Sequence, residues 1–282
     1  MPRFPIVDSH LHLWDRGRLR YPWLAAMPAL DRDFSLADYD AACGAVRVEA
    51  MVFLECDADP AMAIDEARWV AGQAAIEPRI RAMVAQAPVE LGDAVRPHLE
   101  RLAELPLVRG VRRIAKADPD SDFCTRPGVV AGVRALAKHG FSFDLCVAPH
   151  QLASAAALAD LCPDVRLVLD HLGTPAIRDR ALEPWRRDLE ALAERGNVAC
   201  KLSGLATEAG PGWSREDIRP WLDTALEAFG PRRLMFGGDW PVAALAVGYP
   251  DWVALLDWAL GDLSDDEQRA IYAGTATGFY RL

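Results

Sequence analysis

The stretch Ile6-Val7-Asp8-Ser9-His10-Leu11-His12 guides the interpretation of this chain, because a short apolar run ends there in two histidines. In an extended strand, residues two positions apart point to the same side, so His10 and His12 should direct both imidazoles toward one point. Two convergent neutral imidazoles can hold a divalent ion or position a water molecule. Two polar residues on the wet face of a strand would give the same pattern, and the stretch alone does not separate these interpretations.

The far end of the chain has a matching feature. Leu234-Met235-Phe236-Gly237-Gly238-Asp239 is another apolar run, and it delivers a carboxylate. Similar runs recur between the two ends about every 33 residues, which suits a strand, a crossover helix and two loops. The eight runs are 6–13, 51–56, 80–85, 108–115, 141–147, 166–170, 198–202 and 234–237.

Amphipathic stretches typical of helices separate these runs. They are 61–76, 93–105, 127–139, 152–161, 184–195 and 216–229. Pro127 and Pro184 stand where first-turn prolines belong, and Gly140, Gly196 and Gly230 stand just past helix ends. The apolar runs are mostly apolar throughout, as in parallel strands covered on both faces. We therefore predict an α/β fold, a single (β/α)8 TIM barrel that forms one domain over residues 1–282.

The composition argues against several classes of protein. Hydrophobic residues make up 51% and charged residues 26% of the 282 positions, which provides a core and no sign of disorder. The formal net charge of −10 disfavours nucleic acid and a membrane surface as partners. The six cysteines show no CxxC spacing, and no signal-peptide or membrane-spanning stretch is evident. We expect reduced thiols and a cytoplasmic location, with a homo-oligomer left open.

In a barrel of this kind, the active site lies at the C-terminal ends of the strands. Four of the six histidines and one aspartate fall at predicted strand ends. They are His10, His12, His150, His171 and Asp239. The other two histidines have ordinary explanations: His98 lies in a helical stretch, and His139 lies in a last helical turn, where a cation favours the helix dipole. This clustering predicts a catalytic site.

Together these motifs resemble the amidohydrolase superfamily, its amidohydrolase-2 type, and more narrowly the sugar-lactonase group with its L-fuconolactonases and L-rhamnonolactonases. The narrower resemblance rests on five segments spread over nearly the whole chain. They are Asp8-Ser9-His10-Leu11-His12-Leu13-Trp14-Asp15, Tyr21-Pro22-Trp23-Leu24, Leu169-Asp170-His171-Leu172-Gly173, Lys201-Leu202-Ser203-Gly204-Leu205 and Gly238-Asp239-Trp240-Pro241-Val242. One position departs from the pattern. Many superfamily members carry a lysine or glutamate after strand 4 that bridges two metals, whereas Arg112 and Arg113 stand here. A guanidinium cannot ligate a metal, so we expect at most one ion.

The resemblance implies that water opens a sugar-acid lactone, such as L-fucono- or L-rhamnonolactone. It also implies one divalent ion, expected to be zinc, with ligands His10, His12, His150 and Asp239. Asp239 would act as the general base, and His171 would orient the water or stabilise the oxyanion. Which of His150 and His171 ligates the ion stays open. A metal-free route is also chemically adequate, because a lactone is an activated ester.

Substrate contacts are predicted from residue type. A polar sugar lactone needs stacking surface and hydrogen bonds. The candidates are Trp23, Glu55, Arg112, Lys201 and Trp240. Lys201 has a second interpretation, an ion pair with Asp170 or Glu55 inside the barrel.

Two other functions remain open at this point. A metal-dependent decarboxylase or hydratase of aromatic acids shares the amidohydrolase-2 barrel, but such relatives often show Glu-x-His after strand 1, so His-x-His favours hydrolysis. A non-catalytic sugar-acid-binding protein has no need of a base beside a water site.

Overall fold

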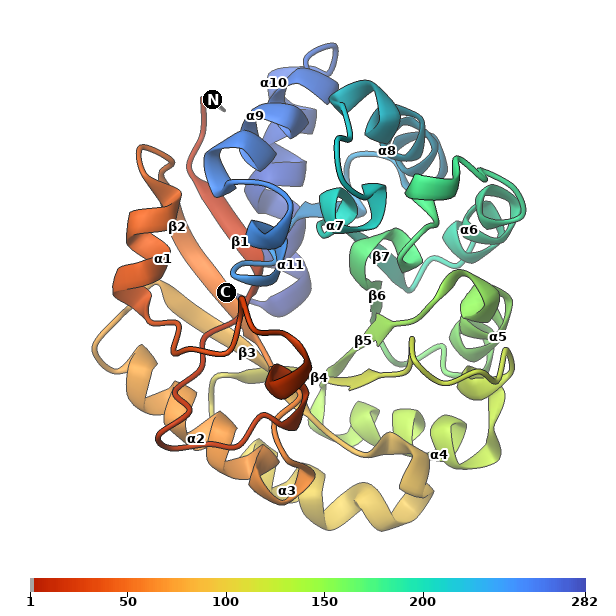
Figure 1. Ribbon diagram of the computed structural model, residues 1–282. Coiled ribbons are helices and arrows are strands. Elements are labelled where there is room, and N and C mark those ends of the chain that lie inside the picture. Colours follow the sequence, from red (N-terminus) through yellow and green to blue (C-terminus); the bar gives the residue numbers. More distant parts are fainter. Residues whose placement is uncertain (1–2) are drawn as a thin grey trace.

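The computed structural model describes residues 3–282 and contains one eight-stranded sheet, whose strands follow one another in sequence order (Figure 1). Each strand pairs in parallel with the next. The strands are β1 (Ile6–Leu11), β2 (Val48–Leu54), β3 (Ile80–Gln86), β4 (Val108–Ile114), β5 (Ser142–Cys146), β6 (Leu167–Leu169), β7 (Val198–Leu202) and β8 (Leu234–Phe236). The predicted (β/α)8 barrel is confirmed, with strands within a few residues of the eight apolar runs.

Helices between the strands cover the outside of the barrel (Figure 1). They are α1 (Leu36–Cys43), α2 (Ala63–Ala74), α3 (Arg96–Ala103), α4 (Pro127–Leu136), α5 (Leu152–Leu161), α6 (Trp185–Ala193), α7 (Leu205–Ala209), α8 (Arg215–Phe229), α9 (Tyr249–Ala259), α10 (Asp265–Arg269) and α11 (Thr275–Tyr280). The six predicted helices correspond to α2–α6 and α8. The prediction missed α1, although Ser35 and Asp38 form a capping box at its start. Within residues 3–282, no helix is long and apolar enough to cross a membrane.

The barrel closes between the first and last strands. Leu11 forms a parallel bridge with Trp240, just beyond the end of β8. The backbone N–H of His12 donates to the Trp240 carbonyl at 2.9 Å, and that of Asp239 donates to the His10 carbonyl at 2.8 Å. Four residues that the sequence marks as functional, His10, His12, Asp239 and Trp240, thus belong to the seam itself.

The carboxylate of Asp8 stabilises the same seam through hydrogen bonds. Its Oδ1 accepts hydrogen bonds from the backbone N–H groups of His10 at 3.0 Å and Gly238 at 2.8 Å. Its Oδ2 accepts from the hydroxyls of Tyr39 and Tyr249 at 2.8 and 2.9 Å. Asp8 is fully buried, so these four donors replace the water that the carboxylate loses.

The interior of the barrel contains an apolar layer. Its members alternate along the strands, as residues on one face of a sheet must. They are Val7, Ala50, Val52, Leu54, Ala82, Val84, Val168, Ala199 and Met235, together with Ala276 and Tyr280 of α11. Toward the C-terminal ends of the strands, where the site lies, the interior side chains are charged.

Candidate active site

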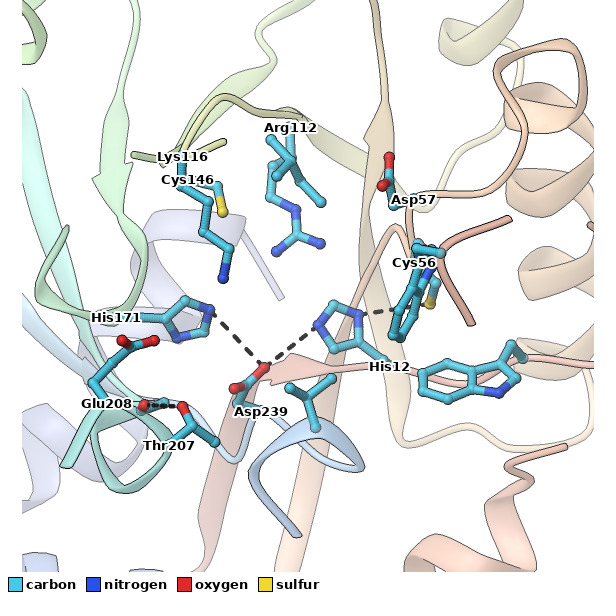
Figure 2. Close-up of a pocket in the computed structure, with 15 residues that line it drawn as sticks. His12, Cys56, Asp57, Arg112, Lys116, Cys146, His171, Thr207, Glu208 and Asp239 are labelled. Carbon is cyan, nitrogen blue, oxygen red and sulfur yellow. Dashed lines mark hydrogen bonds and ion pairs between the residues drawn. The ribbon is translucent and has the colours of Figure 1, made fainter. Parts of the chain in front are cut away.

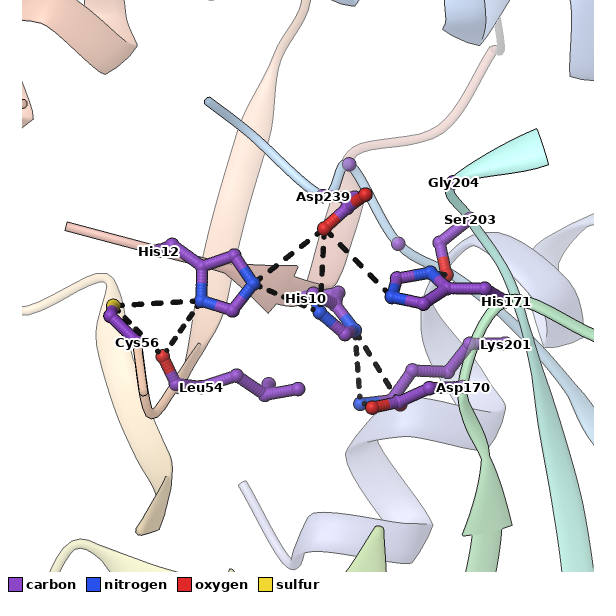
Figure 3. A network of polar contacts seen from close by, with 12 residues as sticks. His10, His12, Leu54, Cys56, Asp170, His171, Lys201, Ser203, Gly204 and Asp239 are labelled. Carbon is purple, nitrogen blue, oxygen red and sulfur yellow. Dashed lines mark hydrogen bonds and ion pairs between the residues drawn. The ribbon is translucent and has the colours of Figure 1, made fainter. Parts of the chain in front are cut away.

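Three side chains from opposite ends of the chain meet at the C-terminal end of the barrel (Figure 3). His10 Nε2 lies 3.1 Å from His12 Nε2 and 3.5 Å from Asp239 Oδ1. His12 Nε2 lies 3.6 Å from the same oxygen. All three side chains are buried. We call these three residues the ligand triangle.

The ligand triangle has the dimensions of a zinc site. Two ligands of a tetrahedral zinc ion lie about 3.3–3.5 Å apart, given zinc–ligand bonds of about 2.0–2.2 Å. His12 Nδ1 lies 2.9 Å from the Leu54 carbonyl, which can only accept, so Nδ1 carries the proton and Nε2 offers its lone pair to the site. Burial lowers the pKa of His10 well below its usual value, with Lys201 assisting and Asp170 opposing, so this imidazole is also neutral. The donors therefore fit one divalent ion.

Five charged side chains lie buried beneath the triangle: Glu55, Arg112, Asp144, Asp170 and Lys201, here called the ion cluster. Arg112 contacts Glu55 Oε1 through Nε at 2.7 Å and Asp170 Oδ2 through Nη1 at 3.2 Å. Lys201 Nζ lies 2.6 Å from Asp144 Oδ2 and 2.9 Å from Asp170 Oδ1. The cluster also reaches His10, whose Nε2 lies 3.3 Å from Arg112 Nη1.

The balance of buried charge also favours a single divalent ion. The ion cluster and Asp239 together hold four carboxylates and two cations, a formal charge of −2 with the histidines neutral. Buried Asp8 is outside this count, because its own four hydrogen-bond donors compensate it. An uncompensated buried charge is costly. One divalent ion in the triangle would cancel the excess, whereas two ions would reverse it beside the Arg112 guanidinium.

His171 stands beside the triangle and is held by its neighbours. Its Nδ1 lies 2.8 Å from Ser203 Oγ, and its Nε2 lies 3.9 Å from Asp239 Oδ1. His171 (φ 52°) and Asp239 (φ 51°) both adopt left-handed backbone conformations, which are strained for side-chain-bearing residues and cluster at functional sites. Gly204 packs against the His171 ring so closely that a Cβ would lie 2.6 Å from Nδ1.

The electrostatics keep Asp239 ionised and His171 neutral. Burial opposes ionisation of Asp239, but His171, His12 and His10 outweigh it and hold the pKa of the carboxyl below its usual value. Burial lowers the pKa of His171, against the opposing pull of Asp239 and Asp170. The site thus offers an anionic acceptor beside a neutral imidazole, the combination that proton transfer from water requires.

A pocket of about 250 Å³ opens above these groups (Figure 2). Its floor includes the polar residues His12, Arg112, His171 and Asp239. The indoles of Trp14 and Trp23 and the thiols of Cys56 and Cys146 contribute apolar walls, and Asp57, Lys116, Thr207 and Glu208 contribute further polar groups. Figure 2 shows the Lys116 amine directed toward His171 and the Glu208 carboxylate close to the same ring.

The predicted substrate contacts divide into two sets. Trp23 and Arg112 line the pocket, as expected. Glu55, Lys201 and Trp240 do not line it. Glu55 is turned toward Arg112, and fully buried Lys201 pairs with Asp170, as its second interpretation held, and with Asp144.

Trp240 is withdrawn from the pocket for a different reason. Its ring packs edge-on against Phe34 and Tyr39, with ring centroids 5.4 Å apart in both pairs. The structure thus places Glu55, Lys201 and Trp240, for which direct substrate contacts were predicted, outside the lining of the pocket.

His150 does not join the ligand triangle. It is exposed on the turn Pro149–Gln151 that leads into α5, and its Nε2 lies 3.2 Å from the Asp118 carbonyl. The two potential ligand groups in residues 3–282 are His10–His12–Asp239 and His10–Asp170–His171. The structure therefore does not support His150 as a ligand, because the turn carries its side chain away from the triangle.

Three residues near the reacting centre were missed as site residues. Asp170 precedes His171 at the same strand end, so the signal for it was present in the sequence. Lys116 follows β4 in a connecting segment, and Glu208 lies in the short helix α7 after β7; the apolar pattern predicts neither position.

The fold and site define a barrel enzyme with a histidine–carboxylate centre, and known proteins agree. Residues 7–282 match the model of the family described as Amidohydrolase. The curated L-fucono-1,5-lactonases of Burkholderia multivorans and Burkholderia ambifaria are 36% and 30% identical, over 98% of this chain and 96% and 95% of theirs. A crystal structure of an amidohydrolase from Burkholderia multivorans with bound zinc has a TM-score of 0.87 and 34% identity, covering 99% of this chain and 100% of that chain. The chain belongs to the amidohydrolase family, within its amidohydrolase-2 sugar-lactonase group.

Proposed function

We propose that this protein hydrolyses a sugar-acid lactone to the free acid, and that an L-fucono-1,5-lactone-like ring is its preferred substrate. The observation that carries the proposal is an ionised Asp239 beside a neutral His171 at the floor of a small pocket. The 36% identity to an L-fucono-1,5-lactonase along almost the whole chain supports the same substrate class.

The ligand triangle fits a divalent ion, which we assign as zinc. Such an ion would make water more acidic and polarise the lactone carbonyl. Asp239 accepts a proton from the attacking water, whose oxygen forms a new bond to the carbonyl carbon. Ser203 holds the His171 ring so that its Nε2 faces the same region, and Arg112 lends positive charge at the pocket floor.

Collapse of the tetrahedral centre then opens the ring. The bond between the carbonyl carbon and the ring oxygen breaks, and the electron pair leaves with that oxygen. Asp239 returns its proton to the departing oxygen, which becomes the hydroxyl group of the product acid. One carboxylate therefore acts first as base and then as acid.

A pH-indicator assay on a panel of lactones tests the proposal, with and without a chelator. Acid release that is fastest from L-fucono- or L-rhamnonolactone is expected, with Asp239→Asn as the inactive control. Carbon dioxide release from aromatic acids would instead identify a decarboxylase, and sugar-acid binding without turnover would identify a binding protein. Faster turnover of hydantoins or dihydropyrimidines than of any aldonolactone would contradict the substrate class.

A further inference from the structure

The ion cluster continues past Lys201 to the C-terminal helix. The Tyr280 hydroxyl of α11 donates to Asp144 Oδ2 at 2.8 Å, and Lys201 Nζ contacts the same oxygen at 2.6 Å. Tyr280, Asp144 and Lys201 are all fully buried. Tyr280 is therefore linked to His10 through three contacts, with Asp144 and Lys201 between them.

The sequence makes room for this tyrosine inside the barrel. Ala50, Ala82 and Ala199 are small residues of the apolar layer, and Tyr280 belongs to the same layer. A ring inserted from α11 fills the space that small strand residues leave near the axis, as close packing requires. Its hydroxyl then meets Asp144 at the boundary with the ion cluster.

His10 Nδ1 has two neighbours, one a hydrogen-bond donor and the other an acceptor. Lys201 Nζ lies 3.4 Å from Nδ1 and can only donate, whereas Asp170 Oδ1 lies 3.5 Å from it and can only accept. If Nδ1 accepts from Lys201, the imidazole proton sits on Nε2, toward His12. If Nδ1 donates to Asp170, the Nε2 lone pair faces the ligand triangle and can also accept from Arg112 Nη1, 3.3 Å away. The position of Lys201 thus influences which form His10 adopts.

We propose that Tyr280 is a positioning residue for His10, acting through Asp144 and Lys201. Asp144 Oδ1 has no hydrogen-bond partner among the described residues, so the donors on this carboxylate are Tyr280 and Lys201 at Oδ2. Without the tyrosine hydroxyl, Asp144 depends on Lys201 alone and draws the ammonium toward itself. Lys201 then donates less to Nδ1, and the imidazole proton moves toward Asp170. The far end of the barrel thereby helps to set the geometry of the site.

Tyr280→Phe tests this step, with Tyr272→Phe as the matched control. The phenylalanine keeps the ring near Lys201, whose Nζ lies 5.6 Å from its centroid, and removes only the hydroxyl. Tyr272 is also fully buried near the C-terminus, but its hydroxyl has no hydrogen-bond partner among the described residues. The same deletion there does not touch the ion cluster.

The measurements use full-length protein with 15N-labelled histidine and do not depend on the substrate. In metal-free protein, NMR of the ring nitrogens reports the fraction of His10 with its proton on Nδ1, and His10→Gln assigns the signals. Tyr280→Phe should raise this fraction and tighten zinc binding about three- to tenfold in a chelator competition, the factor expected from one hydrogen bond. Tyr272→Phe should match the wild type in both.

Asp144→Asn provides a second variant with the opposite sign. It removes the charge that competes for Lys201, so the Nδ1-protonated fraction should fall. In this background Tyr280→Phe should have no further effect, because the connecting carboxylate is gone. An unchanged or opposite shift in Tyr280→Phe, an equal shift in Tyr272→Phe, or a full Tyr280→Phe effect in the Asp144→Asn background would each overturn the proposal. Absence of zinc binding would affect the proposed function, while the His10 signals would still decide this inference.

Discussion

Asp239 can serve as a base because its carboxylate stays ionised among three histidines. Carboxylates that lose water usually become harder to ionise, yet the neighbouring imidazoles lower its pKa. Its left-handed backbone, φ 51°, adds a constraint on which residues can replace it. Asparagine is among the few side-chain-bearing residues that tolerate this region.

Asp239→Asn should therefore separate catalysis from stability. The amide keeps the size and the backbone conformation but cannot take a proton from water. We expect kcat to fall about 10²–10⁴-fold, the usual contribution of a general base. The melting temperature should change little, which differential scanning calorimetry checks. Activity within about threefold of wild type, under ~1 kcal/mol, would exclude Asp239 as the base.

The histidines should set the acidic limit of activity. Burial lowers the pKa of both His171 and His10, so their neutral forms persist to a lower pH than in an exposed histidine. As the pH falls through these lowered values, the imidazoles become charged and activity is lost. The acid limb of kcat/KM should thus lie below about 6.5, the ordinary histidine pKa. A profile of initial rates in non-chelating buffers measures it, and a midpoint above 6.5 would contradict the assignment.

Most of the residues that meet at the candidate site could be predicted from the sequence. His10 and His12 share one side of an extended segment, and His171 and Asp239 follow buried runs, so strand geometry alone brings them together. His150 also follows a strand, but the turn at Pro149 directs it elsewhere, and strand position does not specify a turn. Lys201 and Glu55 were predicted as substrate contacts, with an ion pair to Asp170 as the alternative for Lys201; both side chains are buried, and burial is not visible in residue type.

At the level of elements, the short turn between β7 and α7 controls the position of His171. Gly204 has a left-handed backbone (φ 68°) and lies at the start of α7. The imidazole occupies the space where a Cβ would point. The turn and the catalytic side chain therefore fit together only when this position is glycine.

Gly204→Ala should displace His171 and reduce both activity and stability. The new Cβ would lie 2.6 Å from His171 Nδ1, and alanine pays a cost at positive φ. We expect kcat/KM to fall at least tenfold and the free energy of unfolding to fall by about 1–3 kcal/mol. Gly196→Ala is the control, because nothing lies within 4 Å of its added Cβ. Equal kcat/KM in the two variants would show that the turn does not position His171.

The strands and six of the helices could be predicted because local sequence determines them. The spacing of apolar residues indicates each element, and prolines and glycines mark the helix ends. The ion cluster could not be predicted in the same way. Asp144 and Lys201 stand in strands that are 57 positions apart in the sequence, and their contact depends on barrel register. A charged residue inside an apolar run indicates a position in the barrel, but the sequence does not show with which residue it forms an ion pair.

For the whole molecule, the buried charge predicts the metal content. The excess of two negative charges in the ion cluster and Asp239 equals the charge of one divalent ion. Elemental analysis should find about one zinc per chain, and removal of the ion should lower the melting temperature. A ligand present at 100 times its Kd stabilises the folded state by about 2.7 kcal/mol. His12→Gln should abolish this zinc-dependent shift, and two ions per chain would contradict the charge balance.

The seam between β1 and β8 has a consequence for folding during synthesis on the ribosome. His10 leaves the ribosome early, while Asp239 is added 229 positions later, which takes roughly ten seconds or more at about 5–20 residues per second. During that interval, the nascent chain lacks the third member of the ligand triangle and the strand that covers the open side of β1. A chain terminated before Asp239 therefore has neither a finished barrel nor a complete triangle. Barrel closure and assembly of the ligand triangle therefore both wait for the same late segment, the end of β8 with Asp239 and Trp240.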